Sequence, residues 1–334
     1  MSSRTVVVIT GASSGIGRAT ALRFARQGAS VVLASRRAEA LAELASECEK
    51  LGGNALALRT DVTDQGQVES LARRTIDAFG RIDVWVNNAS VSVFAPFLEM
   101  PIDDFRRVLD VNLMGYVYGA KAALTVMTKQ GHGSLVNVAS IVGEVPQPYT
   151  APYGMAKAAV RALSVSLRSE LALAKQKHIS VSTVLPATID TPFFRHAGNY
   201  TGREVVAMPP VYSPDLVAKT IVKVSRKPEN EVIAGGPIAK ALVAQHRKTP
   251  NAVEAQMAQQ TDKTHLSPTK AARPTRGAVY SPSSTADATV TGGWNGRERE
   301  GKRGILGTLL AAGVGVLLAR RYLANEPGRG SHKR

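Results

Sequence analysis

Short apolar runs alternate with longer stretches of helical periodicity over the first 235 residues of the chain. The runs fall at 5–10, 30–35, 55–59, 84–87, 134–139, 180–185 and 231–235. Such runs are typical of parallel strands that are covered on both faces. The stretches between them place apolar residues at helical spacing, near 16–27, 39–51, 65–79, 103–128, 151–174 and 214–226. The alternation predicts an α/β protein with a doubly wound parallel sheet of seven strands and helices on both faces.

This topology also predicts where a site would lie. Crossovers between parallel strands are right-handed, which brings the carboxyl ends of all the strands to one edge of the sheet. Ligands of such sheets bind along that edge, so the residues that directly follow each strand are the first candidates for function.

The connection after the first run reads TGASSGIG, residues 10–17. Gly11 suits a tight turn, Gly15 lets the backbone approach a pyrophosphate, and Gly17 lets the next helix pack closely on the sheet. The helix N-terminus offers N–H groups and partial positive charge to phosphates. Because the loop joins a strand to a helix, it predicts a Rossmann-like dinucleotide site rather than only a structural turn. Its candidate cofactor contacts are Gly11, Ser13, Ser14, Gly15, Ile16 and Gly17.

The end of the second run bears on which dinucleotide is bound. A carboxylate there would hold the ribose hydroxyls of NAD. This chain has Ser35 and Arg36 instead, and a guanidinium provides a fork of donors for a 2′-phosphate. We therefore expect NADP(H). The alternative is that Arg36 and Arg37 are ordinary surface charges at the start of a helix.

Polar residues also follow the third and fourth runs. Asp61 could accept a hydrogen bond from the adenine amino group, with Val62 beside the ring; Asp61 or Asp64 could instead cap the next helix. Asn87, in the sequence NNAS (87–90), is expected to border the adenosine side of the cofactor.

Tyr153 and Lys157 are four residues apart on a predicted helix and therefore share one face. A free tyrosine has a pKa of about 10, and a neighbouring ammonium favours the phenolate and lowers that pKa. Lys157 could also bind the nicotinamide ribose. Ser140, at the end of the fifth run, could hold the substrate oxygen with which Tyr153 exchanges a proton. Each of these residues taken alone would more often be structural.

Asn112 lies inside the long predicted helix, in the sequence LDVNLMG. Asparagine is a poor helix former whose side chain bonds nearby backbone or water. Asn112 could anchor a water that continues a proton path from Lys157, or it could be a buried polar group with satisfied hydrogen bonds.

Together these motifs resemble the short-chain dehydrogenase/reductase family. The resemblance rests on TGASSGIG, the NNA at 87–89, Asn112, Ser140 and the Tyr153–Lys157 pair, and covers roughly residues 4–236. It implies hydride transfer between nicotinamide C4 and a carbonyl or alcohol carbon, with tyrosine as general acid and base. It also implies a homodimer or homotetramer built partly from the two helices that hold Asn112 and Tyr153.

The chain departs from the family pattern at two small residues, Ser90 and Ala187, where glycine is usual. The segment after Pro186 resembles the family's nicotinamide-contacting stretch, which makes Pro186, Ile189 and Thr191 candidates for cofactor contact. The next stretch resembles the mobile substrate loop. Its aromatic residues Phe193, Phe194 and Tyr212 are expected to line an apolar pocket for a small-molecule carbonyl or alcohol.

The composition argues against several other classes. The single cysteine, Cys48, excludes a disulfide within the chain, and no spacing of Cys or His suggests a metal site. The first residues do not follow the order of a signal peptide, so a cytoplasmic protein is expected. Of the net charge of +16, residues 240–334 supply +10, with 16 Lys and Arg against 6 Asp and Glu. That asymmetry favours a tail that meets an anionic surface; the small number of aromatic residues argues against nucleic acid.

The chain is expected to divide into four parts. Residues 1–246 form the catalytic domain, and the composition of 247–303 predicts a disordered linker. Residues 304–324 form an apolar helix with flanking basic residues, either a membrane anchor or a helix that docks on protein. Residues 325–334 are a basic tail.

Two functions of different classes fit these observations. The first is an NADP(H)-dependent oxidoreductase. The second is a sensor or scaffold that binds NADP(H) without turnover and works through its tail.

Overall fold

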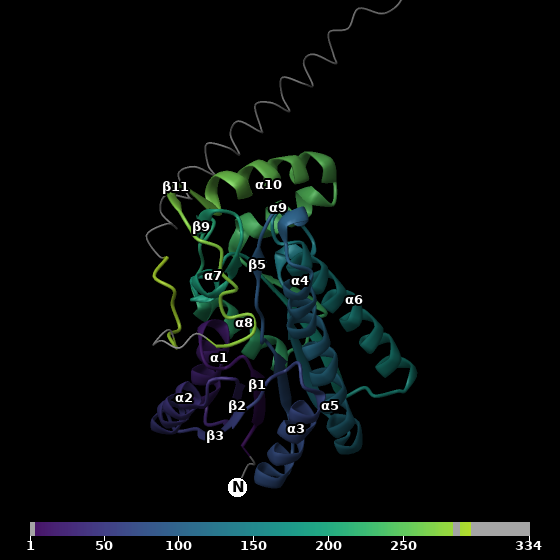
Figure 1. Cartoon of the computed structure of the whole chain (residues 1–334). Coiled ribbons are helices and arrows are strands. Elements are labelled where there is room, and N and C mark those ends of the chain that lie inside the picture. Colours follow the sequence, from purple (N-terminus) through teal and green to yellow (C-terminus); the bar gives the residue numbers. More distant parts are fainter. Residues whose placement is uncertain (1–3, 283–287, 295–334) are drawn as a thin grey trace, which may run out of the picture.

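A computed structural model describes residues 4–282 and 288–294 (Figure 1). Its central sheet has seven parallel strands in the order β10-β7-β6-β4-β1-β2-β3. This arrangement confirms the predicted doubly wound, Rossmann-like sheet. The strands are β1 (Val6–Thr10), β2 (Ser30–Ser35), β3 (Asn54–Arg59), β4 (Val84–Asn87), β6 (Gly133–Val138), β7 (Ile179–Pro186) and β10 (Glu231–Ala234).

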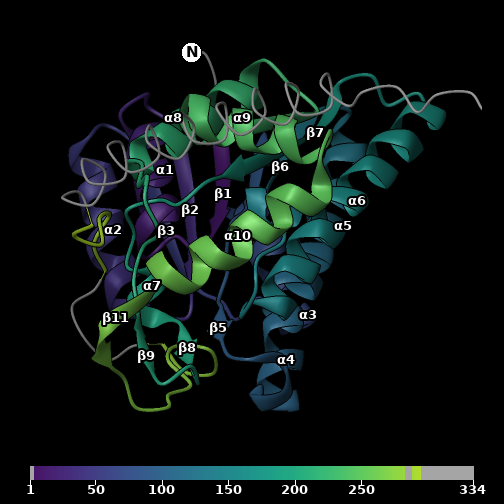
Figure 2. The same ribbon diagram turned by 90° about the horizontal axis from the view of Figure 1, so that it is seen from above.

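Helices cover both faces of the sheet (Figures 1 and 2). On one face lie α1 (Gly15–Ala25), α2 (Ala38–Lys50) and α8 (Pro214–Arg226), and on the other α3 (Gln65–Phe79), α5 (Gly115–Gln130) and α6 (Ala151–Leu173). Val7 and Ile9 of β1 pack into the first core, whereas Val8 packs into the second. This two-sided burial is why β1 is apolar on both of its faces.

The predicted helix near 103–128 is in fact interrupted. It consists of α4 (Ile102–Leu109), a π-helical turn at Asp110–Met114, and α5. The break places Asn112 at the widened turn, and such turns recur at functional sites.

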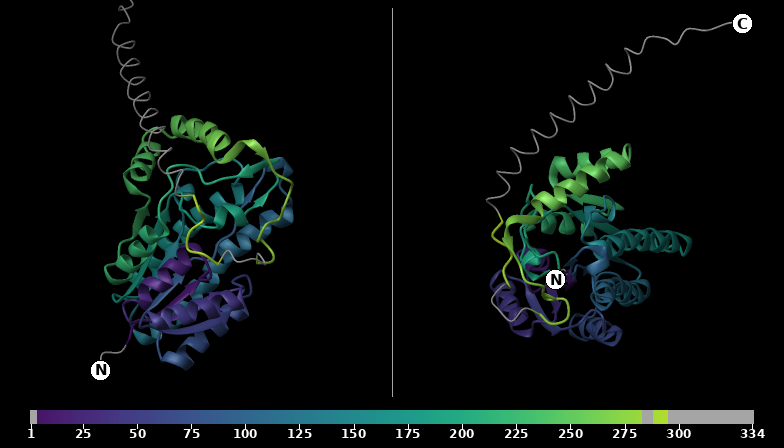
Figure 3. Two further views of the ribbon diagram at one scale, coloured as in Figure 1. Left: turned by 90° about the vertical axis from the view of Figure 1, so that its left-hand side faces the viewer. Right: turned by 45° about the horizontal axis from the view of Figure 1, so that its top comes forward.

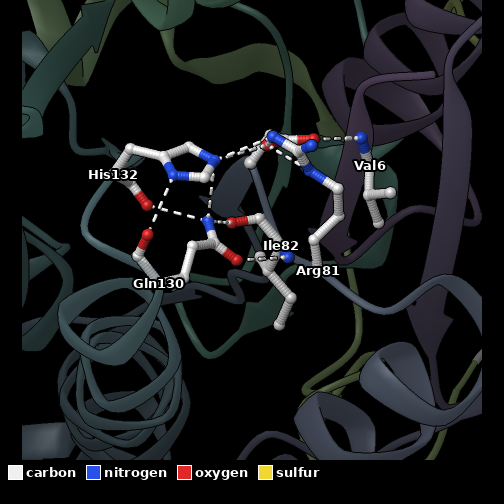
Figure 4. Close-up of polar contacts among 6 residues, drawn as sticks. Val6, Arg81, Ile82, Gln130 and His132 are labelled. Atoms are coloured by element: carbon white, nitrogen blue, oxygen red, sulfur yellow. Dashed lines mark hydrogen bonds and ion pairs between the residues drawn. The ribbon is translucent and has the colours of Figure 1, made fainter. Parts of the chain in front are cut away.

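Polar side chains fasten the amino-terminal edge of the sheet, opposite the predicted site (Figure 4). The side chain of Gln130 accepts from the backbone N–H of Ile82 at 3.2 Å and donates to its carbonyl at 2.7 Å. Asp83 accepts from the N–H of Val6 at 2.8 Å and pairs with Arg81 at 2.5 Å. The bonds tie β1, β4 and the end of α5 together.

The prediction of a disordered linker over 247–303 is wrong for residues 250–271. After α9 (Gly236–His246), the chain forms α10 (Pro250–Thr264) and β11 (Leu266–Ala271). Val253 and Met257 of α10 are buried against Val145 and Met208, and β11 pairs with β9 (Arg203–Val205). A few buried apolar residues therefore attach this segment to the rest of the fold. The folded unit extends beyond the expected boundary at 246.

The apolar segment 304–324 and the tail 325–334 lie outside the described residues. Within the described ranges, no helix has both the length and the apolar character that a membrane crossing requires. Cys48 lies on the buried face of α2, and burial raises the pKa of its thiol to about 12.

Candidate active site

A cleft of about 280 Å³ lies along the carboxyl ends of the strands. It brings together most of the predicted site residues, which are distant in the sequence. Those that line it are Gly11, Ser13, Ser14, Gly15, Ile16, Ser35, Arg36, Asp61, Val62, Ser140, Tyr153, Lys157, Pro186, Ile189 and Thr191. Gly17, Asn87 and Asn112 do not line it.

The loop between β1 and α1 has the shape that close backbone approach requires. Gly11 has φ +64°, and a Cβ there would lie 2.7 Å from Cα of Ala89. Gly15 has φ +55°, and its Cβ would press against Thr191 across the cleft. A Cβ on Gly17 would meet the carbonyl of Gly11 at 2.2 Å, so Gly17 shapes the loop from behind. The loop thus leaves a bare backbone cradle that fits a dinucleotide pyrophosphate.

Two arginines, Arg36 and Arg37, follow β2 and line the cleft. Arg37 donates to the hydroxyl of Ser13 at 3.1 Å, and its own N–H donates to Ser35 at 3.2 Å. Arg36 lines the cleft and donates to the backbone carbonyls of residues 278–280. The described residues at the end of β2 include no carboxylate, so the donor set fits a phosphate better than a ribose diol.

Asp61 lies at the cleft with one carboxylate oxygen bonded to Thr63 and the other paired with Arg107 at 2.9 Å. Burial opposes ionisation, but the bonds from Thr63 and the charge of Arg107 outweigh it and hold the pKa below its ordinary value. Asp64, the alternative capping residue, accepts from the N–H of Gln67 and caps α3. Arg107 was not predicted as a partner of Asp61, because Arg107 lies on α4, far from Asp61 in the sequence.

The prediction that Asn87 borders the cofactor is wrong. Its side chain is buried in the core, where it accepts from Trp85 at 2.8 Å and donates to Asn137 at 3.0 Å. The next residue, Asn88, lines the cleft and donates to the carbonyl of Thr10 at 3.0 Å. The alternation of side chains along a strand separates the two asparagines.

Ser140, Tyr153 and Lys157 converge at the centre of the cleft. Ser140 follows β6 and is hydrogen-bonded to Tyr153 on the first turn of α6. The ammonium of Lys157 lies 5.6 Å from the centre of the Tyr153 ring. It donates to the carbonyl of Val138 and to the hydroxyl of Tyr116, each at 3.0 Å. Tyr116, on α5, was not expected, because nothing in its local sequence sets it apart.

Burial dominates the protonation of this group. Desolvation raises the pKa of Tyr153 to about 12, although the bond from Ser140 opposes the rise. Desolvation lowers the pKa of Lys157 to about 7. The predicted lowering of the tyrosine pKa by the lysine is therefore not found in the protein alone, because a low-dielectric setting penalises both charged forms.

Asn112 is buried behind this group. Its amide oxygen accepts from Ser90 at 3.2 Å and from the N–H of Val91 at 2.9 Å, and its amide nitrogen donates to the carbonyl of Val91 at 2.8 Å. The side chain joins the π-helical turn to the chain after β4. Its predicted role in a proton path stays a prediction.

The far end of the cleft is apolar and aromatic. Phe193 and Phe194 of α7 (Phe193–His196) line it as predicted. Tyr212 does not: its backbone forms a bridge with Ile189 and its ring packs against Gly236. The other apolar or aromatic residues at this end are Phe94, Val142, Val145, Met208, Leu242, Met257 and His265.

The comparisons with known proteins agree with this geometry. Residues 5–200 match the family model described as short chain dehydrogenase. The chain belongs to this family. It is therefore an oxidoreductase by relationship, and the Rossmann-like sheet is the one expected for such proteins.

Individual relatives cover most of the folded part. The uncharacterized oxidoreductase YxnA of Bacillus subtilis is 38% identical over 239 residues, which are 71% of this chain and 67% of that protein. An alcohol dehydrogenase from Thermococcus sibiricus, solved with 5-hydroxy-NADP, is 27% identical with a TM-score of 0.60 and covers 69% of this chain and 95% of its own. A short-chain dehydrogenase/reductase from Burkholderia phymatum, solved with NAD, is 26% identical with a TM-score of 0.68 and covers 75% and 95%.

Proposed function

We propose that this protein is an NADP(H)-dependent oxidoreductase that transfers a hydride between nicotinamide and the carbon of a carbonyl or secondary alcohol. The observation that carries the proposal is the convergence of Ser140, Tyr153 and Lys157 beside a glycine cradle in one cleft. The coenzyme, when bound, supplies or accepts the hydride. All other steps fall to side chains of this chain.

Tyr153 is the proton donor in the reducing direction. Its pKa of about 12 keeps it protonated at neutral pH, so the phenol is ready to donate as negative charge develops on the substrate oxygen. The Ser140 hydroxyl can donate to the same oxygen. Lys157, through Tyr116 and Val138, is held beneath the phenol ring, where its charge would stabilise the phenolate left behind.

Arg36 supports the choice of NADP(H). It is the first residue after β2 and lines the cleft, and a carboxylate that would repel a 2′-phosphate is absent from the described residues at that position. The two solved relatives contain different dinucleotides, one NADP-derived and one NAD, so the choice rests on this residue.

The substrate is a neutral, predominantly apolar carbonyl or alcohol compound. Phenylalanine, methionine and leucine side chains surround the end of the cleft next to Tyr153. Among the described residues of that end, no lysine or arginine other than Lys157 lines the wall. A carboxylate or phosphate on the substrate would therefore lose its hydration without a counter-charge.

A second copy of the chain is the expected partner. Large apolar side chains are exposed on α4, on α6 and between α4 and α5: Ile102, Met114, Met155, Val165 and Leu173. These exposed side chains are candidates for a subunit interface, since a contiguous apolar patch of that kind marks an interaction site. A homodimer or homotetramer would cover them. Cytoplasmic location and membrane contact through 304–324 remain proposals from the sequence.

The experiment that tests catalysis replaces Tyr153 with phenylalanine and leaves Tyr118→Phe as a control on the neighbouring helix. Loss of NADPH absorbance is followed with a panel of apolar ketones and aldehydes. We expect Tyr153→Phe to lower kcat at least about 100-fold, since a positioned acid contributes on that order, and to bind NADPH as wild type does.

The alternative, a sensor or scaffold without turnover, predicts another result. NADPH would bind to the wild type, but no carbonyl in the panel would be reduced, and Tyr153→Phe would change neither observation.

A further inference from the structure

The chain after β11 returns across the coenzyme end of the cleft. Figure 3 shows this stretch, drawn in yellow-green, passing from the upper part of the molecule down to the purple N-terminal elements. We name its described parts, residues 275–282 and 288–294, the strap. Ala278 and Pro282 of the strap line the cleft.

The first part of the strap is hydrogen-bonded to the guanidinium of Arg36. The guanidinium donates to the carbonyls of Ala278 at 2.6 Å, Val279 at 3.2 Å and Tyr280 at 2.7 Å. These bonds use both terminal nitrogens, which are the pair that grips a phosphate in bidentate fashion. The residue that would recognise a 2′-phosphate is thus already bound to the protein's own backbone.

The second part occupies the phosphate loop. The N–H of Gly15 donates to the carbonyl of Thr289 at 2.9 Å. The indole N–H of Trp294 donates to the carbonyl of Thr191 at 3.1 Å, and the N–H groups of Gly292 and Trp294 donate to Asp190, each at 2.9 Å. The carbonyl oxygen of Thr289 therefore lies at the cradle that fits a pyrophosphate.

We propose that the strap is an internal competitor of the coenzyme: it covers Arg36 and the Gly15 loop in the free protein, and NADP(H) binds by displacing it. The proposal rests on the proposed function, since it takes Arg36 as the reader of the 2′-phosphate. A phosphate is charged and a carbonyl is neutral, so the charge-assisted bonds favour the exchange.

The strap consequently affects the difference in affinity between NADP(H) and NAD(H). Only a ligand with a 2′-phosphate gains new bonds to Arg36 when the first part leaves. If the strap is displaced about a tenth of the time in the free protein, the apparent affinity is about tenfold weaker than that of an open site.

Two glycines allow the strap to be loosened by substitutions within the strap itself. A Cβ on Gly277 would lie 2.3 Å from the carbonyl of His196, and one on Gly292 would lie 2.2 Å from the carbonyl of Thr191. Both alanine variants therefore push the strap away from its seat. Ser281→Ala changes an exposed strap residue and is the matched control.

The test measures binding of 2′,5′-ADP and 5′-AMP to the full chain, because these probes differ only in the 2′-phosphate. We expect Gly277→Ala to bind 2′,5′-ADP about tenfold more tightly than wild type and 5′-AMP nearly unchanged. Gly292→Ala should tighten binding of both, and Ser281→Ala neither. Thermal unfolding of each variant checks that the body is folded.

Trp294 gives an independent signal. The chain has two tryptophans, and the other, Trp85, is fully buried in the core. Addition of 2′,5′-ADP to the wild type should shift the emission to longer wavelength as Trp294 enters water, and Trp294→Phe should abolish the shift.

The outcomes separate the two proposals. Unchanged or weaker binding of 2′,5′-ADP in both glycine variants would overturn the proposal that the strap competes with the coenzyme. Weaker binding would mean that the strap instead positions Arg36 for the phosphate. Equal affinity of 2′,5′-ADP and 5′-AMP in the Gly277→Ala variant would instead overturn the assignment of NADP(H).

Discussion

At the residue scale, the site buries two ionisable groups whose charged forms are unfavourable there. Tyr153 and Lys157 occupy a low-dielectric position where burial raises the tyrosine pKa to about 12 and lowers the lysine pKa to about 7. Lys157 donates hydrogen bonds to the hydroxyl of Tyr116 and to the carbonyl of Val138. Burial of these two ionisable groups therefore lowers the stability of the folded chain, and perturbed pKa values of this kind are common at active sites.

That cost has a signature in the pH dependence of stability. The Lys157 pKa is lower in the folded than in the unfolded chain, so between about pH 7 and its ordinary value the unfolded chain binds more protons and stability rises with pH. Cys48, with its pKa raised to about 12, opposes the rise above about pH 9. We expect the free energy of unfolding to increase by about 2 kcal/mol from pH 7 to 9.

Replacement of Lys157 by methionine removes the titrating group and should leave the unfolding free energy flat over this window. Denaturant titration of wild type and variant at several pH values measures both. An equal slope in the two proteins would show that Lys157 is not the origin.

At the element scale, α10 supplies part of the wall at the apolar end of the cleft. Met257 of α10 is buried and lines the cleft, and Asp262 accepts a hydrogen bond from Tyr149 at 2.8 Å and pairs with Arg203. The helix is thereby fastened to the loop before α6 and to β9. It lies outside the stretch that matches the family model.

Met257→Ala should therefore affect substrate more than coenzyme. Removal of the side chain leaves a hollow in the wall, and we expect a loss of about 2 kcal/mol in unfolding free energy together with a rise in KM for bulky ketones. Gln259→Ala, on the exposed side of α10, is the control. Steady-state kinetics with a small and a bulky ketone checks this; equal changes in KM for both would argue against α10 as the wall.

The difference between prediction and structure also lies at this scale. The seven strands were predicted from the apolar runs, and most site motifs from the residues directly after them. This works because the carboxyl ends of parallel strands lie at one edge of the sheet, so a residue's place after a strand also gives its place in the fold. Asn87 was misplaced since two adjacent asparagines face opposite ways. The helix at 250–264 was missed because Val253 and Met257 lie in a polar sequence, where long-range contacts outweigh composition. Arg107, Tyr116 and the strap depend on contacts between segments far apart in the chain.

At the scale of the whole molecule, a charged cluster joins the segment after β6 to the C-terminal half. Glu144, four residues after Ser140, pairs with Arg161 of α6 and accepts from Arg247 at 2.7 Å. Arg161 also pairs with Glu231 of β10 at 2.7 Å. Burial opposes the ionisation of Glu144, but the bond from Arg247 and the charge of Arg161 hold its pKa below the ordinary value.

This cluster makes the fold sensitive to acid. Because the folded pKa of Glu144 is depressed, its contribution to stability is present above the unfolded pKa of about 4.5 and is lost as the pH falls through the folded value. We expect Glu144→Gln to be less stable at pH 7 and to lose less stability on acidification. Thermal unfolding between pH 3 and 7 measures the two curves; parallel curves would refute the assignment.

The burial of Cys48 gives the chain a practical property. Its side chain has no solvent-exposed area, and a thiol with a pKa of about 12 is almost entirely un-ionised at neutral pH, whereas alkylating reagents require the thiolate. A cysteine engineered at an exposed position, such as Ser281→Cys, would be the main target of a maleimide dye. The native sequence is thus already suited to site-specific labelling, in which a fluorophore at position 281 would report whether the strap leaves its seat when a ligand binds.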